Sequence, residues 1–374
     1  MSATPATTKL APDQVQLRDL IRRLAEVTST EAPILSMYAD LRPGAHGDRP
    51  AERAELTVIR HRLNDLTDGQ PAHTSSRASL DSDRERVDRF LASENMDGVA
   101  GLAIFACDAI GLWEIVRSPE PFATEVTAGP TVDLFGLARL LDGSLAAVVA
   151  LVDTSTCRLF VTRFGDLRER KGPEEPPDEH KRHQQGGWSQ ARYQRHVDTQ
   201  DRRFAKEAAD AIERLVRTEH PRHVLLAGDE RSVSTLEREL SEVVRPLVEH
   251  VARIEVRATL DDVRNEVRPI LAALEEAQGT GVADRAIAGR RSGDLGVTGI
   301  NATTAALEAG QVDELVIDET APIDDGLRAE LIRMASLTDA RVEVVKDHEP
   351  LLRHEGVGAT LRFRIGANGA SDHS

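Results

Sequence analysis

Short apolar runs alternate along this 374-residue chain with segments of helical periodicity, and this alternation constrains the fold more than any other feature. Residues 222–229 (RHVLLAGD) and 312–318 (VDELVID) are rich in the aliphatic and β-branched residues typical of strands. Each run is followed by a segment whose apolar residues recur every three or four positions, as in an amphipathic helix. Because alternating strands and helices form sheets covered by helices, the sequence predicts an α/β fold.

The length favours more than one domain. At roughly 100–200 residues per domain, a chain of 374 residues forms two or three. We predict three α/β domains, over residues 1–135, 140–265 and 280–374, with a turn at Gly279-Thr280-Gly281 before the third. The middle domain carries a long exposed loop and a basic helix, and the third is a compact α/β sandwich.

Hydrophobic periodicity predicts the individual elements. Helices are expected at residues 17–28, 51–66, 82–93, 189–218, 231–245, 259–277, 299–309 and 325–337. Strands are expected at residues 33–38, 101–108, 111–119, 144–153, 156–166, 222–229, 251–257, 312–318, 340–347 and 358–365. Aromatic residues make up only 3% of the chain, so aliphatic side chains must build the cores. Few rings remain for stacking on bases, which argues against an aromatic-platform RNA binder.

The charge is unevenly distributed. The whole chain has 47 Lys and Arg against 63 Asp and Glu, a formal net charge of −16, which by itself argues against nucleic-acid binding. Residues 180–206, however, carry seven Lys and Arg against two Asp, a balance of +5 over 27 residues. These seven cationic residues are our candidates for RNA binding: Lys181, Arg182, Arg192, Arg195, Arg202, Arg203 and Lys206.

The basic segment combines a loop with a helix. Residues 168–187 contain three prolines and no aliphatic residue, which predicts an exposed, mobile loop that ends in Gly186-Gly187. In the helix that follows, Phe204 and Ala208 belong to an apolar stripe, and a separate basic stripe comprises Arg192, Arg195, Arg202 and Lys206. A Gly-Gly tip joined to a cationic helix suits insertion into an anionic RNA cavity. The alternative is a solvated, charged helix after a disordered loop.

Other motifs point away from common enzyme classes. Cys107 and Cys157 are the only cysteines, and each lies in a strand-like run, so we predict buried thiols without a disulfide. The chain lacks GxSxG, HExxH and P-loop signatures. His180 and His183 have a three-residue spacing that could hold a metal, but they lie in a proline-rich loop with no partner cysteine, so neither a metal nor a cofactor is predicted.

Three further features lie outside the basic segment. Asp324-Asp325 precedes a predicted helix and suits N-capping. Residues 289–299 are predicted to form a loop, in which Arg290 and Arg291 are secondary candidates for RNA contact. The N-terminus lacks the pattern of a signal peptide, and no apolar stretch approaches 18 residues, so we expect a soluble cytoplasmic protein without a membrane partner.

Residues 186–211 (GGWSQARYQRHVDTQDRRFAKEAADA) resemble the Gly-Gly-Gln loop and following helix of archaeal and eukaryotic-type class-1 peptide chain release factors, a family with a Pelota-like three-domain fold. The hairpin at 144–166 and the stretches at 296–319 and 357–365 also agree in pattern, so that the resemblance spans about residues 95–366 in the family's order. The residues that agree in place in the loop and helix are Gly186, Gly187, Ser189, Arg192, Tyr193 and Arg195.

The chain departs from this family at two functional positions. Trp188 stands where the family has its catalytic glutamine, and the nearest glutamine, Gln190, lies two positions later. The first domain also lacks the Asn-Ile-Lys-Ser motif that reads stop codons. The chain is therefore similar to the divergent bacterial branch of the family, which includes the ribosome-hibernation factor Balon, and codon-directed termination is not expected.

This resemblance implies a translation factor that binds the ribosomal A site in hibernation, stalling or a stress response. The implied partners are ribosomal RNA, tRNA, and elongation factor Tu or another translational GTPase. The loop expected to face the peptidyl transferase centre comprises Gly186, Gly187, Trp188, Ser189 and Gln190. An enzymatic alternative is a rescue or release factor that hydrolyses peptidyl-tRNA, with Gln190 in the glutamine's place. A third reading is a protein that has kept the fold and binds another anionic partner.

Overall fold

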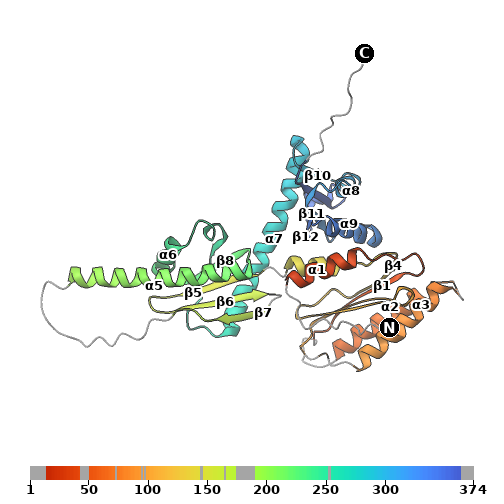
Figure 1. The fold of residues 1–374 in the computed structure, drawn as a ribbon, viewed down its shortest axis with the longest axis horizontal. Coiled ribbons are helices and arrows are strands. Elements are labelled where there is room, and N and C mark those ends of the chain that lie inside the picture. The colour runs from red at the N-terminus through yellow and green to blue at the C-terminus, as the bar shows by residue number, and fades with distance from the viewer. Residues whose placement is uncertain are drawn as a thin grey trace, which may run out of the picture. The chain divides into compact units, whose positions relative to one another are not determined.

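The computed structural model describes residues 14–42, 50–71, 74–93, 96, 98–143, 146–163, 166–173, 190–251 and 254–363. The chain divides into two compact units, one made of Met1–Gly143 with Ala273–Ser374 and the other of Ser144–Ala272. Three sheets lie among the described residues, and helices accompany each of them (Figure 1). The predicted α/β fold class is confirmed, whereas the division into three domains stays a prediction.

The first sheet belongs to the first unit and has the antiparallel order β3-β2-β1-β4. The predicted hairpin at 101–119 is present as β2 and β3, joined by a single 3-10 turn at Asp108–Ile110. Aliphatic side chains from α2 and α3 pack on this sheet, as the scarcity of aromatic residues requires. The elements are α1 (Gln14–Ala25), β1 (Ile34–Asp40), α2 (Pro50–Asp68), α3 (Ser75–Ser93), β2 (Gly101–Cys107), β3 (Leu112–Ser118), β4 (Glu125–Gly129) and α4 (Phe135–Gly143).

The second sheet also belongs to the first unit and has the order β10-β13-β11-β12. Strands β11 and β12 are parallel, and β13 runs antiparallel to both β11 and β10. Asp324 caps the N-terminus of α9 by accepting a hydrogen bond from the Leu327 amide, so the predicted cap is confirmed. The elements are α7 (Leu260–Ser292), β10 (Gly296–Thr298), α8 (Ile300–Glu308), β11 (Val312–Asp318), α9 (Asp325–Leu337), β12 (Arg341–Val345), α10 (Glu349–Leu352) and β13 (Val357–Leu361).

Within the first unit, specific polar contacts join the N-terminal and C-terminal parts of the chain. Arg328 of α9 donates to the Glu125 carboxylate of β4 at 3.1 Å, and its guanidinium lies 4.4 Å from the ring centroid of Phe135. The Asp142 carboxylate accepts a hydrogen bond from the amide of Val344 in β12 at 3.2 Å. These contacts explain why segments more than 200 residues apart in sequence form one unit.

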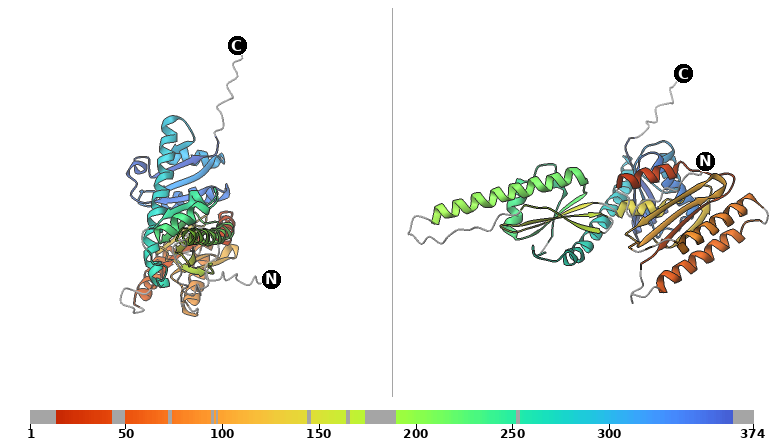
Figure 2. Two further views of the ribbon diagram at one scale, coloured as in Figure 1. Left: turned by 90° about the vertical axis from the view of Figure 1, so that its left-hand side faces the viewer. Right: turned by 60° about the horizontal axis from the view of Figure 1, so that its bottom comes forward.

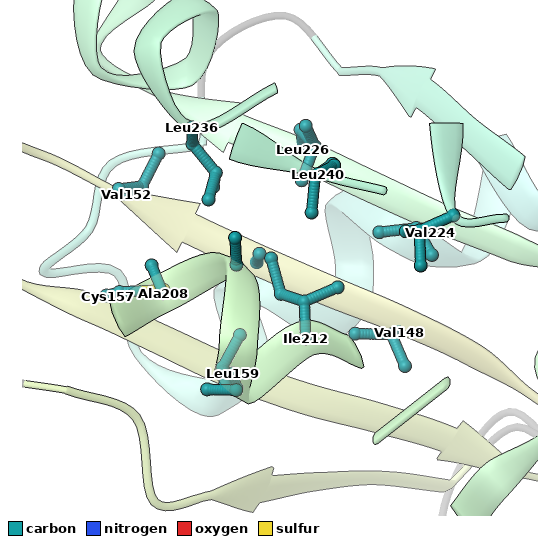
Figure 3. Close-up of a cluster of buried hydrophobic side chains, with 14 of the residues drawn as sticks. Val148, Val152, Cys157, Leu159, Ala208, Ile212, Val224, Leu226, Leu236 and Leu240 are labelled. Carbon is teal, nitrogen blue, oxygen red and sulfur yellow. The ribbon is translucent and has the colours of Figure 1, made fainter. Parts of the chain in front are cut away.

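The second unit contains one mixed sheet of order β7-β6-β5-β8-β9. Strands β5, β8 and β9 are parallel, and β5, β6 and β7 form an antiparallel meander. Helices α5 and α6 pack together on this sheet around aliphatic residues such as Val148, Ile212 and Leu236 (Figure 3). The elements are β5 (Ala147–Val152), β6 (Cys157–Arg163), β7 (Asp166–Arg170), α5 (Gln190–Glu219), β8 (His223–Gly228), α6 (Glu230–Glu239) and β9 (Val248–His250).

Three predictions about local structure were wrong. The turn expected at 279–281 lies inside α7. A Cβ on Gly279 would stand 2.8 Å from Val345 Cγ1, so the glycine permits close packing of the helix there. The loop expected from residue 168 begins later, since β7 forms a charged edge strand on β6. The strand expected at 251–257 is instead the short β9, which ends at His250.

Boundaries also shift around the third predicted domain. Helix α7 continues to Ser292, and β10 follows at 296–298, so the segment expected as a loop at 289–299 is partly helix and partly strand. Strand β4 and helix α4 had no counterpart among the expected elements. Their sequences are short, and only pairing with β1 and packing beside β12 identify them.

Both cysteines are buried and neither forms a disulfide, as predicted. Burial raises the pKa of the Cys157 thiol to about 12, so this side chain behaves as a small apolar residue at neutral pH. None of the helices in the described part of the chain combines the length and hydrophobicity needed to span a lipid bilayer.

The buried carboxyl of Asp83 makes the stability of the first unit depend on pH. Burial raises the pKa of Asp83 from 3.8 to about 6, although the carboxylate accepts a hydrogen bond from the Asp108 amide. The folded state therefore binds this proton more tightly than the unfolded state. Its stabilising contribution is complete below pH 3.8 and is lost as the pH rises to about 6.

We expect Asp83→Asn to remove this pH dependence, because an amide does not titrate. Between pH 4 and 6 the wild type should lose about 2 kcal/mol of unfolding free energy relative to the variant. Urea unfolding of both proteins across this range measures the difference. Parallel curves for the two proteins would contradict the prediction.

Candidate RNA-binding helix

Helix α5 carries most of the predicted site. It runs without proline or glycine from Gln190 to Glu219, and its many Ala, Arg, Glu and Gln residues favour helix. Phe204, Ala208 and Ile212 are buried against the sheet, so the predicted apolar stripe is confirmed at these positions. Figures 1 and 2 show the first part of α5 continuing beyond the ends of β5 and β6. The helix is therefore anchored to the unit at one end and extends from it at the other.

Two ion pairs join α5 to α6. Arg202 Nε lies 2.9 Å from Glu239 Oε1, and the Arg231 guanidinium lies 3.6 Å from the Asp201 carboxylate. The Glu239 side chain is only 18% exposed, whereas Arg202 is 76% exposed. Exposed pairs of this kind contribute about 0.2–1 kcal/mol each, so apolar packing supplies most of the stability. The pairs add to the apolar contact between α5 and α6.

Arg203 and Lys206 present their charges differently. Arg203 is 80% exposed, and its contact is with Glu207 one turn along the same helix, at 3.2 Å. Such a pair contributes about 0.2–0.5 kcal/mol, which a phosphate group could readily outcompete. Lys206 is also exposed. Among the candidates whose side chains are described, these two are the cations best placed to meet an external anion.

The other predicted site residues either have only their backbone described or lie outside the described residues. Gln190, Arg192 and Arg195 belong to α5, for which the structure gives the backbone at these positions. Lys181, Arg182, Gly186, Gly187, Trp188 and Ser189 lie outside the described residues, as do His180 and His183. Their roles stay predictions.

The chain is held against β6 at Gly172 and Pro173, immediately after β7. The Cys157 amide donates to the Pro173 carbonyl at 3.2 Å, which ties the chain after β7 to the start of β6. A Cβ on Gly172 would lie 1.8 Å from the Cys157 carbonyl oxygen, so only glycine permits this approach. The described chain is therefore fixed as far as Pro173.

A shallow pocket lies where β5 and α6 approach α5. Its apolar lining includes Val152, Phe204 and Ala205, and its polar lining includes Asp153 and Arg231. The sequence alone did not predict this pocket, because its lining residues come from three separate segments of the chain. Within the described ranges, no group of three or more His, Cys, Asp or Glu side chains is arranged to hold a metal ion.

Residues 134–278 match the model of bacterial archaeo-eukaryotic release factor family 10. The matched segment contains the whole second unit and the basic helix α5. The predicted resemblance to release factors is therefore confirmed. Among curated proteins, none matches this chain.

Several solved structures are similar to this chain. A model of ribosome-bound archaeal Pelota with ABCE1 is 14% identical, with 95% of this chain and 96% of that chain covered and a TM-score of 0.45. Archaeal translation termination factor aRF1 is 18% identical, with 94% and 99% covered and a TM-score of 0.26. Dom34 of S. cerevisiae, a termination-like factor that interacts with Hbs1, is 11% identical, with 71% and 81% covered and a TM-score of 0.43.

Proposed function

From the release-factor match over residues 134–278, we propose that this protein is a ribosome-binding translation factor that occupies the A site without reading stop codons. It acts in ribosome hibernation or stalling. The observation that carries the proposal is the position of the basic helix, because α5 lies wholly inside the matched segment. The cationic face of α5, with Arg203 and Lys206 exposed, contacts ribosomal RNA or tRNA in this proposal.

The distribution of charge supports α5 as the RNA contact. Residues 144–272 carry 22 Lys and Arg against 23 Asp and Glu, a balance of −1. The rest of the chain carries 25 against 40, a balance of −15. The negative charge outside the second unit disfavours indiscriminate RNA binding, so that the basic helix binds where the shape of the RNA also fits.

The Gly-Gly segment is the reason why we propose a non-catalytic role for this protein. In release chemistry, a glutamine beside two glycines helps to position water and to stabilise the developing oxyanion of the peptidyl-tRNA ester. Here Trp188 occupies the glutamine's place, and an indole cannot accept a hydrogen bond from the attacking water. We infer that residues 186–190 approach the peptidyl transferase centre and fill it without cleaving the ester.

The partners follow from the same inference. The ribosome supplies the anionic surface for α5, and tRNA in a neighbouring site is a second RNA partner. The C-terminal part of the chain, residues 280–374, docks with elongation factor Tu or another translational GTPase. Co-sedimentation of this protein with ribosomes, compared in the presence and absence of the GTPase, tests whether residues 280–374 dock with it.

An assay of peptide release separates this proposal from the rescue alternative. Stalled ribosomes that carry labelled peptidyl-tRNA should release no peptide above background when the wild-type protein is added, because the catalytic glutamine is absent. Gln190→Ala should behave in the same way. Release by the wild type that Gln190→Ala abolishes would instead establish the rescue activity and place Gln190 at the ester.

A further inference from the structure

A second cationic cluster lies in the first unit, in residues that the helix α5 proposal does not use. Arg290 and Arg291 occupy the last turn of α7, and His354 follows α10. Arg290 Nη1 lies 2.7 Å from His354 Nδ1 and donates to the Thr298 hydroxyl at 2.9 Å. Helix α7 and the segment after α10 therefore bring these basic side chains together from positions more than 60 residues apart.

The charged groups that act most strongly on His354 are arginines. Burial lowers the pKa of His354, and the positive charges of Arg290 and Arg291 lower it further. Both arginines are exposed and the imidazole is half-buried. His354 lies beside two arginines, and their positive field would attract an anion. This holds even though the first unit as a whole has a formal net charge of −15.

Two of the acidic side chains nearby are committed to other groups. Glu355 Oε2 accepts the Ile300 amide at 2.8 Å, at the start of α8. Glu349 pairs with Arg353 at 2.7 Å. Asp294, in the turn after α7, is exposed. Arg291 has no ion pair within the described residues, so its charge remains available to an external group.

We propose that Arg290, Arg291 and His354 form a binding site for a phosphate group, supplied by the backbone of RNA. Two guanidinium groups and an imidazole match the charge and the hydrogen-bond acceptors of a phosphate. Thr298 holds Arg290 in place from a buried position in β10, where it is 4% exposed. The competing explanation is that the two arginines only compensate the negative end of the α7 dipole.

The test uses the full chain and follows the His354 ring by NMR as the pH is varied, with His354→Gln to assign its signal. Inorganic phosphate, compared with chloride at equal ionic strength, should raise the pKa of His354 by about one unit, because a bound anion favours the imidazolium. A short RNA duplex should produce the same rise. No change with either probe would overturn the proposal and leave the dipole explanation.

Two variants make the test specific. Arg291→Gln should remove most of the rise, and circular dichroism checks that this exposed substitution leaves the fold intact. Arg353→Gln is the matched control, since its charge is already paired with Glu349, and it should keep the full rise. If inorganic phosphate raises the pKa of His354 and the RNA duplex does not, the anion site is supported but RNA is overturned as the source of the phosphate group. Because the assay contains no ribosomes, its result is independent of whether α5 binds them.

Discussion

Reversing the charges of Arg203 and Lys206 together should abolish co-sedimentation of this protein with vacant ribosomes. Both side chains are exposed on the cationic face of α5, and neither holds the helix to α6. The double variant Arg203→Glu, Lys206→Glu loses two phosphate contacts and places two carboxylates beside RNA. We expect the affinity for ribosomes to fall by at least about tenfold for each reversed charge. The slope of log affinity against log salt concentration should also become shallower, by the equivalent of about two phosphate contacts.

The matched control is Arg214→Glu, which makes the same substitution at an exposed position of α5 two turns beyond Lys206. It should co-sediment like the wild type, because residue 214 lies outside the basic segment. Arg202→Glu is less informative, since it would place a second carboxylate against Glu239 and loosen the contact between α5 and α6. Undiminished co-sedimentation of the double variant would remove α5 as the RNA contact.

Gly228→Ala should destabilise the second unit by about 3 kcal/mol or more. Gly228 ends β8 with φ of +124°, and a Cβ there would stand 2.0 Å from the carbonyl oxygen of Val152 in the neighbouring strand. The same carbonyl accepts the Asp229 amide at 2.9 Å, so the backbone cannot retreat without losing a hydrogen bond. Hydrogen exchange of amides in β5 and β8 measures the loss, because it reports on this unit directly.

Gly111→Ala separates the clash from the backbone conformation. Gly111 also has a positive φ, +71°, but a Cβ there meets nothing within 4 Å. Its cost should be only the left-handed conformation, about 1–2 kcal/mol, and it should appear in the first unit. If Gly228→Ala and Gly111→Ala cost the same, close approach to Val152 would not be the reason for the glycine.

How far the sequence predicted the site depends on the residue. The stripe of Phe204, Ala208 and Ile212 followed from helical spacing, because a long amphipathic helix has one buried face wherever it packs. The partner of Arg202 did not follow, since Glu239 lies 37 residues away on another helix. Arg202 and Arg203 are neighbouring arginines that the sequence cannot tell apart. Only the packing of α6 shows that Arg202 makes an internal contact with Glu239, whereas Arg203 is exposed to an external anion.

The sequence by itself determined the α/β class, the basic segment at 180–206 and the buried state of both cysteines, because periodicity and local charge are properties of neighbouring residues. Only the tertiary structure shows why a glycine suits position 279 within a helix, since a Cβ there would meet Val345 of β12. It also decided which cations gather at His354. Contacts between distant segments depend on how the elements pack, and no local pattern records that packing.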